Sequence, residues 1–173
     1  MVSPETVHRK SYNNQNFIKE KLALFTTAIG SIAPNFSWKE NNQNFSLSSI
    51  NEAENYVLVF WSTDCSHCLR EIPELHKSLQ QKSNIKVIAF AMERNDTGWK
   101  KMKGTLSNWH HVLGLNKWEN KIARTYNILS TPTYFILDNN DFCTICENTI
   151  VDTDNNGVDD YLDEGVKIDY SDN

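Results

Sequence analysis

Two cysteines lie three residues apart in the stretch Trp61-Ser62-Thr63-Asp64-Cys65-Ser66-His67-Cys68. The continuous apolar run 56–61 precedes them and is typical of a strand that is covered on both faces. The amphipathic stretch 69–81, which contains Pro73, follows them with its leucines and isoleucine at helical spacing. The cysteine pair is therefore predicted at the point where a buried strand ends and a helix begins.

This position affects the reactivity of the cysteine pair. Free backbone N–H groups and the helix dipole stabilise an anion at a helix N-terminus, and a thiolate there has a depressed pKa. Cys65 falls at the exposed tip, and Cys68 falls one turn into the helix. Cys65 can therefore attack a disulfide, after which Cys68 can release the mixed disulfide.

The rest of the chain alternates between strand and helix patterns. This alternation predicts an α/β fold whose central strands are parallel. The stretches expected to form strands are 36–38, 45–47, 56–61, 85–92, 110–115, 133–138 and 142–151, and those expected to form helices are 14–29, 69–81, 97–109 and 116–128. We expect His76 on the surface, and Trp99, Trp109 and Trp118 in the core.

Composition limits the classes of function. A chain of 173 residues with 39% hydrophobic residues suits about one globular domain. The net charge of −5 is concentrated at the end, because residues 152–173 hold eight acidic residues and one basic residue. No basic stripe favours nucleic acid. No apolar run reaches the 18 residues that indicate a transmembrane segment.

The N-terminal region is better interpreted as an amphipathic helix than as a signal peptide. Its apolar part, residues 22–33, is interrupted by polar residues and glycine, and about twenty residues precede it. If the protein is exported, we expect its targeting segment to lie outside this sequence.

Four stretches together resemble the thioredoxin-fold thiol–disulfide oxidoreductases of the extracytoplasmic TlpA/ResA-like branch. They are residues 29–36, Phe60 to Cys68, Glu71-Ile72-Pro73 and Ser130-Thr131-Pro132-Thr133. The resemblance implies a thioredoxin-like three-layer α/β/α fold with a central mixed sheet, extended here by an N-terminal helix and strand segment. It implies an N-terminal extension at 1–28, a thioredoxin-like domain at 29–151 and an acidic tail at 152–173.

The resemblance also assigns catalytic roles. Cys65 resembles the attacking cysteine, Cys68 the resolving cysteine, and Pro132 the family's cis-proline beside the pair. Glu71 matches an acid that this branch keeps near the resolving cysteine, where a carboxylate can accept the proton of Cys68. The alternative for Glu71 is a solvated residue in the first turn of the helix, favoured there by the dipole.

Four further residues are expected to contact substrate: Trp61, Ser66, His67 and Thr131. The backbone of Thr131 would pair with a substrate peptide in a strand-like manner. The imidazole of His67 would stabilise the Cys65 thiolate, whereas the carboxylate of Asp64 would oppose it. The balance predicts a reduction potential of about −270 to −180 mV, between thioredoxin and protein disulfide isomerase.

The acidic tail contains a candidate calcium loop. Its proposed ligands are Asp152, Asp154, Asn156, Val158, Asp160 and Asp163, with Gly157 at the sixth position. The loop resembles those of thrombospondin type 3 and dockerin modules, although it ends in Asp rather than Glu. The alternative is a disordered acidic tail.

A second cysteine pair, Cys143 and Cys146, has three open interpretations. The two thiols can form an auxiliary disulfide across a turn or bulge, remain free, or bind zinc together with the first pair and His67. Known zinc sites separate their pairs by about 15–20 residues, and Cys68 and Cys143 are much further apart.

The sequence therefore predicts a thiol–disulfide oxidoreductase that acts on protein thiols and disulfides through Cys65 and Cys68. It would work with an upstream thiol reductant or oxidant in the bacterial periplasm or cell envelope, as a monomer, without a cofactor for the redox step. The alternative is a non-catalytic thioredoxin-fold binding module with structural cysteines and a calcium-binding tail. A peroxiredoxin is disfavoured, because the usual proline is missing from 61–65.

Overall fold

A central five-stranded sheet organises the computed structural model, which describes residues 30–139 and 143–145. The strand order is β5–β4–β3–β6–β7, and a separate two-stranded hairpin, β1–β2, precedes the sheet. β3 pairs in parallel with β4, β4 pairs in parallel with β5, and β6 runs antiparallel to both β3 and β7. The mixed sheet is therefore confirmed. The strands are β1 (Ser37–Glu40), β2 (Gln43–Ser46), β3 (Asn55–Trp61), β4 (Ile85–Glu93), β5 (His110–Leu115), β6 (Thr133–Asp138) and β7 (Cys143–Ile145).

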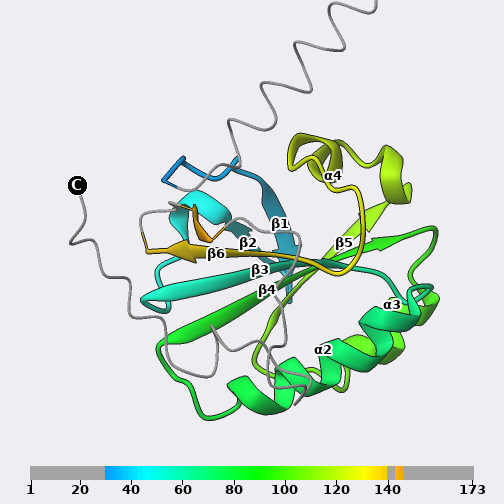
Figure 1. Ribbon diagram of the computed structural model, residues 1–173, viewed down its shortest axis with the longest axis horizontal. Coiled ribbons are helices and arrows are strands. Elements are labelled where there is room, and N and C mark those ends of the chain that lie inside the picture. Colours follow the sequence, from blue (N-terminus) through cyan, green and yellow to red (C-terminus); the bar gives the residue numbers. More distant parts are fainter. Residues whose placement is uncertain (1–29, 140–142, 146–173) are drawn as a thin grey trace, which may run out of the picture.

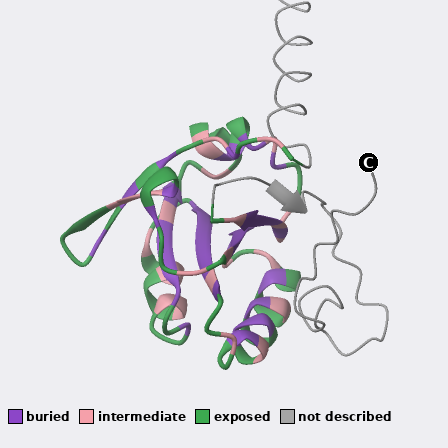
Figure 2. Cartoon of the chain, turned by 90° about the vertical axis from the view of Figure 1, so that its left-hand side faces the viewer, coloured by how far each residue is buried: buried purple, intermediate pink, exposed green. Residues whose placement is uncertain are grey.

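Helices cover one face of the sheet, and the hairpin and a short helix lie over the other (Figure 1). α2 (Ser66–Leu79) and α3 (Thr97–Lys103) form the first layer, and α4 (Lys121–Thr125) lies on the opposite side with β1 and β2. Short 3-10 turns occupy Leu47–Ser49 and Lys117–Glu119. Figure 2 shows buried strands between helices whose outer faces are exposed. This arrangement confirms the thioredoxin-like three-layer fold.

β3 shows why the sequence buries this sheet on both faces. Residues 56–61 are each at most 1% exposed. Because successive strand residues point to opposite faces, Tyr56, Leu58 and Phe60 pack in the cluster under the hairpin. Val57, Val59 and Trp61 pack in the cluster under α2. The predicted doubly covered strand is therefore confirmed, and it leads directly into the cysteine pair.

The two helices predicted after β4 are shorter in the structure. The helix expected over 97–109 ends at Lys103, with Gly104 as its cap. The stretch expected as one helix over 116–128 divides into Lys117–Glu119 and α4, because Asn120 adopts an extended backbone. The Asn120 side chain accepts hydrogen bonds from the N–H groups of Ile122 and Ala123 at 2.9 and 3.3 Å, which starts a new helix.

Two expectations about burial are wrong. His76 is only 9% exposed, and its Nε2 donates a hydrogen bond to the Ser107 carbonyl at 3.0 Å. Trp118, expected in the core, is 48% exposed. Periodicity places His76 on a helix but does not reveal the loop that packs over it.

A buried polar network attaches the hairpin to the edge strand β5. Glu40, at the end of β1, is 9% exposed and accepts hydrogen bonds from His110 Nδ1 at 3.1 Å and from Lys103 Nζ at 3.0 Å. His110 Nε2 lies 3.2 Å from Glu52 Oε2. Burial raises the pKa of Glu40, but the hydrogen bonds from Lys103 and His110 outweigh it and lower the pKa overall.

Several predictions fall outside the described residues. They are the helix at 14–29, the candidate calcium loop at 152–163, and Cys146 with its pairing to Cys143. Of the return strand predicted over 142–151, the backbone of Cys143–Ile145 pairs antiparallel to β6. Within residues 30–139 and 143–145, no helix combines the length and hydropathy needed to cross a membrane.

Candidate active site

Cys65 lies where the sequence predicts, between the end of β3 and the start of α2. It is the N-cap of α2, with φ −100° and ψ 115°, and its Sγ accepts a hydrogen bond from the Cys68 N–H at 3.2 Å. Cys65 is partly exposed, whereas Cys68 is 0% exposed, and both are free thiols. The predicted positions at the tip and one turn into the helix are therefore found.

The surroundings of the two thiols separate their acidities. Burial raises the pKa of Cys65. Hydrogen bonds from the side chains of Cys68 and Thr131 and from the N–H groups of Cys68 and His67 outweigh it, so that the pKa is lowered overall. Burial, with the hydrogen bond to Cys65, raises the pKa of Cys68 to about 12. Cys65 is thus the sulfur that ionises first, and Cys68 holds its proton.

Thr131 and Pro132 reach the cysteines from the loop before β6. The Thr131–Pro132 peptide bond is cis, as the resemblance implied. The Cys65 thiol donates a hydrogen bond to the Thr131 carbonyl oxygen, with 3.2 Å between Sγ and O. The antiparallel pairing of β3 with β6 places Phe60 opposite Thr133, so the end of one strand and the start of the other meet at this point.

The proposed substrate-contacting residues are not all accessible. Trp61 is 0% exposed, because it faces the core under α2. Its assignment to direct substrate contact is therefore wrong. Ser66 and His67 are exposed in the first turn of α2. Thr131 is half-buried beside Cys65.

The His67 imidazole is engaged along the helix. Arg70 Nη2 donates a hydrogen bond to His67 Nδ1 at 3.0 Å, and Glu71 Oε1 lies 3.9 Å from the same nitrogen. The group of His67 that stabilises the Cys65 thiolate is its backbone N–H. The backbone N–H of His67 is thus a stabilising group that the sequence did not indicate, and the role of its imidazole stays a prediction.

Glu71 lies on α2 one turn after Cys68 and is partly exposed. Its carboxylate contacts Arg70 Nη2 at 3.3 Å and accepts a hydrogen bond from Tyr134 Oη at 3.4 Å. Its role as the proton acceptor for Cys68 stays a prediction.

A cavity of about 260 Å³ opens beside Cys65. Its lining includes Cys65 and Thr131, and sequence reasoning missed several of the others: Met92, Lys117 and Trp118. Lys117 and Trp118 follow β5 and are distant in sequence from Cys65, so no local pattern marks them.

Glu93 fixes the loop before Cys65. This residue ends β4, is 3% exposed, and accepts a hydrogen bond from the Thr63 N–H through Oε1 at 2.6 Å. Gly98 in α3 packs so closely on the same loop that an added Cβ would lie 2.6 Å from Thr63 Oγ1. The loop is therefore held by both the sheet and α3.

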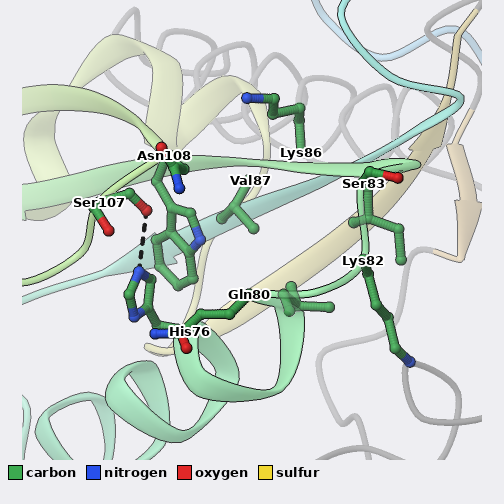
Figure 3. Close-up of a pocket in the computed structure, with 11 residues that line it drawn as sticks. His76, Gln80, Lys82, Ser83, Lys86, Val87, Ser107 and Asn108 are labelled. Carbon is green, nitrogen blue, oxygen red and sulfur yellow. Dashed lines mark hydrogen bonds between the residues drawn. The ribbon is translucent and has the colours of Figure 1, made fainter.

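A second cavity, of about 270 Å³, lies at the opposite end of the sheet (Figure 3). It is bounded by the end of α2 and the starts of β4 and β5, and its lining includes His76 and Ser107, which are joined by a hydrogen bond. Lys82 and Lys86 extend away from each other. Among the residues that the structure describes, no cysteine or carboxylate lines this cavity.

His67→Pro is expected to lower the reduction potential of the Cys65–Cys68 pair. Proline is tolerated in the first turn of a helix but lacks the N–H that stabilises the thiolate, and a less stable reduced form makes the disulfide a weaker oxidant. One charge-assisted hydrogen bond contributes about 1.5–3 kcal/mol, which corresponds to about 30–60 mV. Equilibration in glutathione buffers measures the shift.

His67→Ala is the matched control, because it removes the imidazole and keeps the N–H. We expect its potential to stay close to that of the wild type. A shift in His67→Ala as large as that in His67→Pro would show that the imidazole, and not the main chain, tunes the thiolate.

Comparison with known proteins gives relatives of one enzyme class. The thiol-disulfide oxidoreductase ResA of Geobacillus kaustophilus is 24% identical over 127 residues, which cover 72% of this chain and 70% of that protein. The thioredoxin-like protein YneN of Bacillus subtilis is 26% identical over 110 residues, covering 63% of this chain and 65% of the relative.

Solved structures agree with these relatives. A domain described as a possible thiol-disulfide isomerase from Cytophaga hutchinsonii is 28% identical with a TM-score of 0.58, and the match covers 70% of this chain and 84% of that one. The thioredoxin domain of a thiol-disulfide oxidoreductase from Bacteroides vulgatus is 25% identical with a TM-score of 0.59, covering 69% and 88%. The prediction of a thioredoxin-like thiol–disulfide oxidoreductase is confirmed at the level of enzyme class.

The match to a family model covers more than half of the chain. The AhpC/TSA family model matches residues 29–144. The matched range contains the cysteine pair, the cis-proline and the central sheet except the last residue of β7, Ile145. From its sequence and its fold together, the chain belongs to the AhpC/TSA family.

Proposed function

We propose that this chain exchanges disulfides with protein substrates through Cys65 and Cys68. The observation that carries the proposal is the asymmetry of the pair. Cys65 is accessible and has a lowered pKa, whereas Cys68 is fully buried with its pKa raised to about 12. A thiolate is the attacking species in disulfide exchange, and the second thiol must wait until a mixed disulfide has formed.

The reaction then proceeds in two balanced steps. The Cys65 thiolate attacks one sulfur of a substrate disulfide, whose S–S bond breaks, and the second substrate sulfur leaves as a thiolate and takes a proton. Cys68 then loses its proton and attacks Cys65 Sγ, which releases the first substrate sulfur as a thiol. The substrate gains two electrons and two protons, and the Cys65–Cys68 disulfide forms. A thiol reductant restores the pair, and an oxidant drives the reverse direction.

Glu71 is the proposed acceptor of the Cys68 proton in the second step. It lies one helical turn after Cys68 and is partly exposed, so that a proton taken there can pass to water.

The surface around Cys65 suits a protein partner. Trp118 lines the cavity beside Cys65 and is 48% exposed, Leu69 follows Cys68 and is 45% exposed, and Leu129 precedes the Thr131 loop and is 73% exposed. Exposed apolar side chains of this size mark interaction surfaces when they gather. The proposed contact also includes strand-like hydrogen bonds from the Thr131 backbone and from the first turn of α2 at Ser66.

The remaining parts of the proposal concern cofactors and location. The sulfurs carry the electrons, so the redox step requires no cofactor, and we infer a site of action in the periplasm or cell envelope from the resemblance to the TlpA/ResA-like branch. The protein is proposed to act as a monomer. Calcium binding by residues 152–163 stays a prediction, which melting curves of the full chain with and without millimolar calcium would test.

Cys68→Ser is expected to trap mixed disulfides with protein substrates. The Cys65 thiolate still attacks, but the buried sulfur that releases the partner is gone. The measurement is the recovery of a covalent adduct, sensitive to dithiothreitol, after incubation with a protein that contains an accessible disulfide.

The matched control is the double variant Cys65→Ser with Cys68→Ser, which should form no adduct through this site. Mapping the adduct by mass spectrometry separates Cys65 from Cys143 and Cys146. An adduct that involves another cysteine, or no adduct with any disulfide protein, would contradict the proposal.

A further inference from the structure

We propose that Lys117 is a positioning residue that keeps the Cys65 thiolate stable by neutralising the carboxylate of Asp64. Asp64 directly precedes the nucleophile, and Lys117 comes from the loop after β5. The proposal rests on Cys65 being the attacking cysteine of the proposed function, and it assigns the tuning of that cysteine to a residue 52 positions further along the chain.

The Lys117 side chain lies over the loop before Cys65, residues 62–64, which we call the active-site loop. Its Nζ forms an ion pair with Asp64 Oδ2 and lies 3.4 Å from Ser62 Oγ. The Lys117 side chain is 16% exposed, whereas that of Asp64 is 65% exposed. Both residues line the cavity that contains Cys65. The ammonium group is therefore held at the site rather than extended into solvent.

The backbone around Lys117 adopts an uncommon conformation. Asn116 and Lys117 have φ values of 71° and 46°. The left-handed region is tolerated by asparagine but is rare for a residue such as lysine. Such conformations persist only where the surrounding structure requires them, and they cluster at functional sites.

Hydrogen bonds hold this turn in place. The N–H of Glu119 donates to the Asn116 carbonyl at 2.9 Å, and the N–H of Asn120 donates to the Lys117 carbonyl at 3.0 Å. Asn120 Nδ2 also donates to the Leu115 carbonyl at 2.9 Å. These hydrogen bonds hold the turn after β5 in the backbone conformation that directs Lys117 toward Asp64.

Asp64 directly precedes Cys65, so the charge of its carboxylate affects the stability of the Cys65 thiolate. A carboxylate next to a thiolate raises the thiol pKa. The hydrogen bond and the charge of Lys117 lower the pKa of the Asp64 carboxyl, so that it stays ionised and its charge is balanced by a cation. The other charged groups here are Arg94, which also attracts Asp64, and Glu93, whose carboxylate is bound to the Thr63 N–H. Without Lys117, the negative charge of Asp64 would destabilise the Cys65 thiolate, and only more distant cations would offset it.

The test measures the rate of Cys65 alkylation by iodoacetamide as a function of pH, followed on the Cys65 peptide by mass spectrometry. The variants are Lys117→Met, Asp64→Asn and the two combined. At low salt and at a pH below the Cys65 pKa, Lys117→Met is expected to slow alkylation about three- to tenfold. The double variant should react at the rate of Asp64→Asn, since no carboxylate remains to be neutralised.

Three controls separate this role from a structural one. Lys117→Arg should retain the wild-type profile, because it keeps the cation. Lys100→Met removes a lysine of equal charge whose partner is Asp96, and it should leave the profile unchanged. The slowing in Lys117→Met should largely disappear at 1 M salt, where the screening length is about 3 Å.

Two results would overturn the proposal. One is an unchanged alkylation profile in Lys117→Met. The other is equal slowing by Lys117→Met in the wild-type and Asp64→Asn backgrounds, which would show that the lysine does not act through the carboxylate. Alkylation reports the thiolate whether or not the protein exchanges disulfides, so failure of the proposed function would appear separately, as the absence of trapped adducts in Cys68→Ser.

Discussion

Cys65→Ser is expected to abolish the reduction of protein disulfides by this chain. A serine hydroxyl does not ionise near neutral pH and cannot form the mixed disulfide, and Cys68 cannot replace Cys65 because it is fully buried with its pKa raised to about 12. The measurement is the rate of insulin disulfide reduction in the presence of dithiothreitol. We expect the variant to match the rate without protein.

The pH dependence of the wild-type enzyme gives an independent check. Hydrogen bonds lower the pKa of Cys65 despite its burial, so the fraction of thiolate rises with pH below the ordinary thiol value of about 8.5. The rate of attack should rise over that same lowered range. Full activity in Cys65→Ser would refute the redox assignment, whereas equal activity in Cys143→Ser and Cys146→Ser would show that the second pair is not needed.

Glu40→Ala is expected to lower the free energy of unfolding by about 3 kcal/mol. Removing one partner of a buried ion pair leaves the other charge without compensation, and such losses are typically about 3–5 kcal/mol. The value should lie at the lower end because Lys103, at 31% exposed, can turn toward water. Urea denaturation measures the loss, and hydrogen exchange in β1 and β2 should report that the hairpin separates from β5.

Glu52→Ala is the matched control for this network. Glu52 contacts the same histidine, His110, but its side chain is 39% exposed, so the loss should stay under about 1 kcal/mol. Equal losses in Glu40→Ala and Glu52→Ala would contradict the importance of burial.

The Glu40 contribution also depends on pH. Because the folded protein holds the pKa of Glu40 below its ordinary value of about 4.3, the contribution is complete above that value and is lost as the pH falls through the lowered pKa. The difference in stability between wild type and Glu40→Gln should therefore shrink upon acidification.

The cysteine pair shows what sequence could predict about this site. A buried strand, two cysteines and an amphipathic helix follow one another within about twenty residues, so their relative positions are set by local periodicity. The structure accordingly places Cys65 at the helix N-cap and Cys68 in the core. Thr131 and Pro132 were found through the resemblance, because their contact with Cys65 depends on the pairing of β6 with β3.

Lys117 and Glu93 show what sequence could not predict. Each acts on the active-site loop from the end of a different strand, through contacts with Asp64 and Thr63 that have no sequence spacing of their own. Trp61 shows the reverse error: its position next to the motif suggested substrate contact, but the alternation of side chains along β3 turns it into the core. Periodicity identifies elements, whereas contacts between loops depend on how those elements are packed.

The contact between Cys65 and Thr131 bears on when, during synthesis of the chain, the Cys65 thiol becomes reactive. Thr131 is the 66th residue that the ribosome adds after Cys65, and reaching it takes about 3–13 s at 5–20 residues per second. The Thr131 side chain is one of the groups whose hydrogen bonds lower the pKa of Cys65, and it reaches Cys65 only once β6 has paired with β3. We therefore expect Cys65 of a nascent chain to be less acidic than that of the finished protein. We expect the emerging polypeptide to be a poorer partner for thiol exchange until its sheet is complete, which limits premature coupling to neighbouring cysteines.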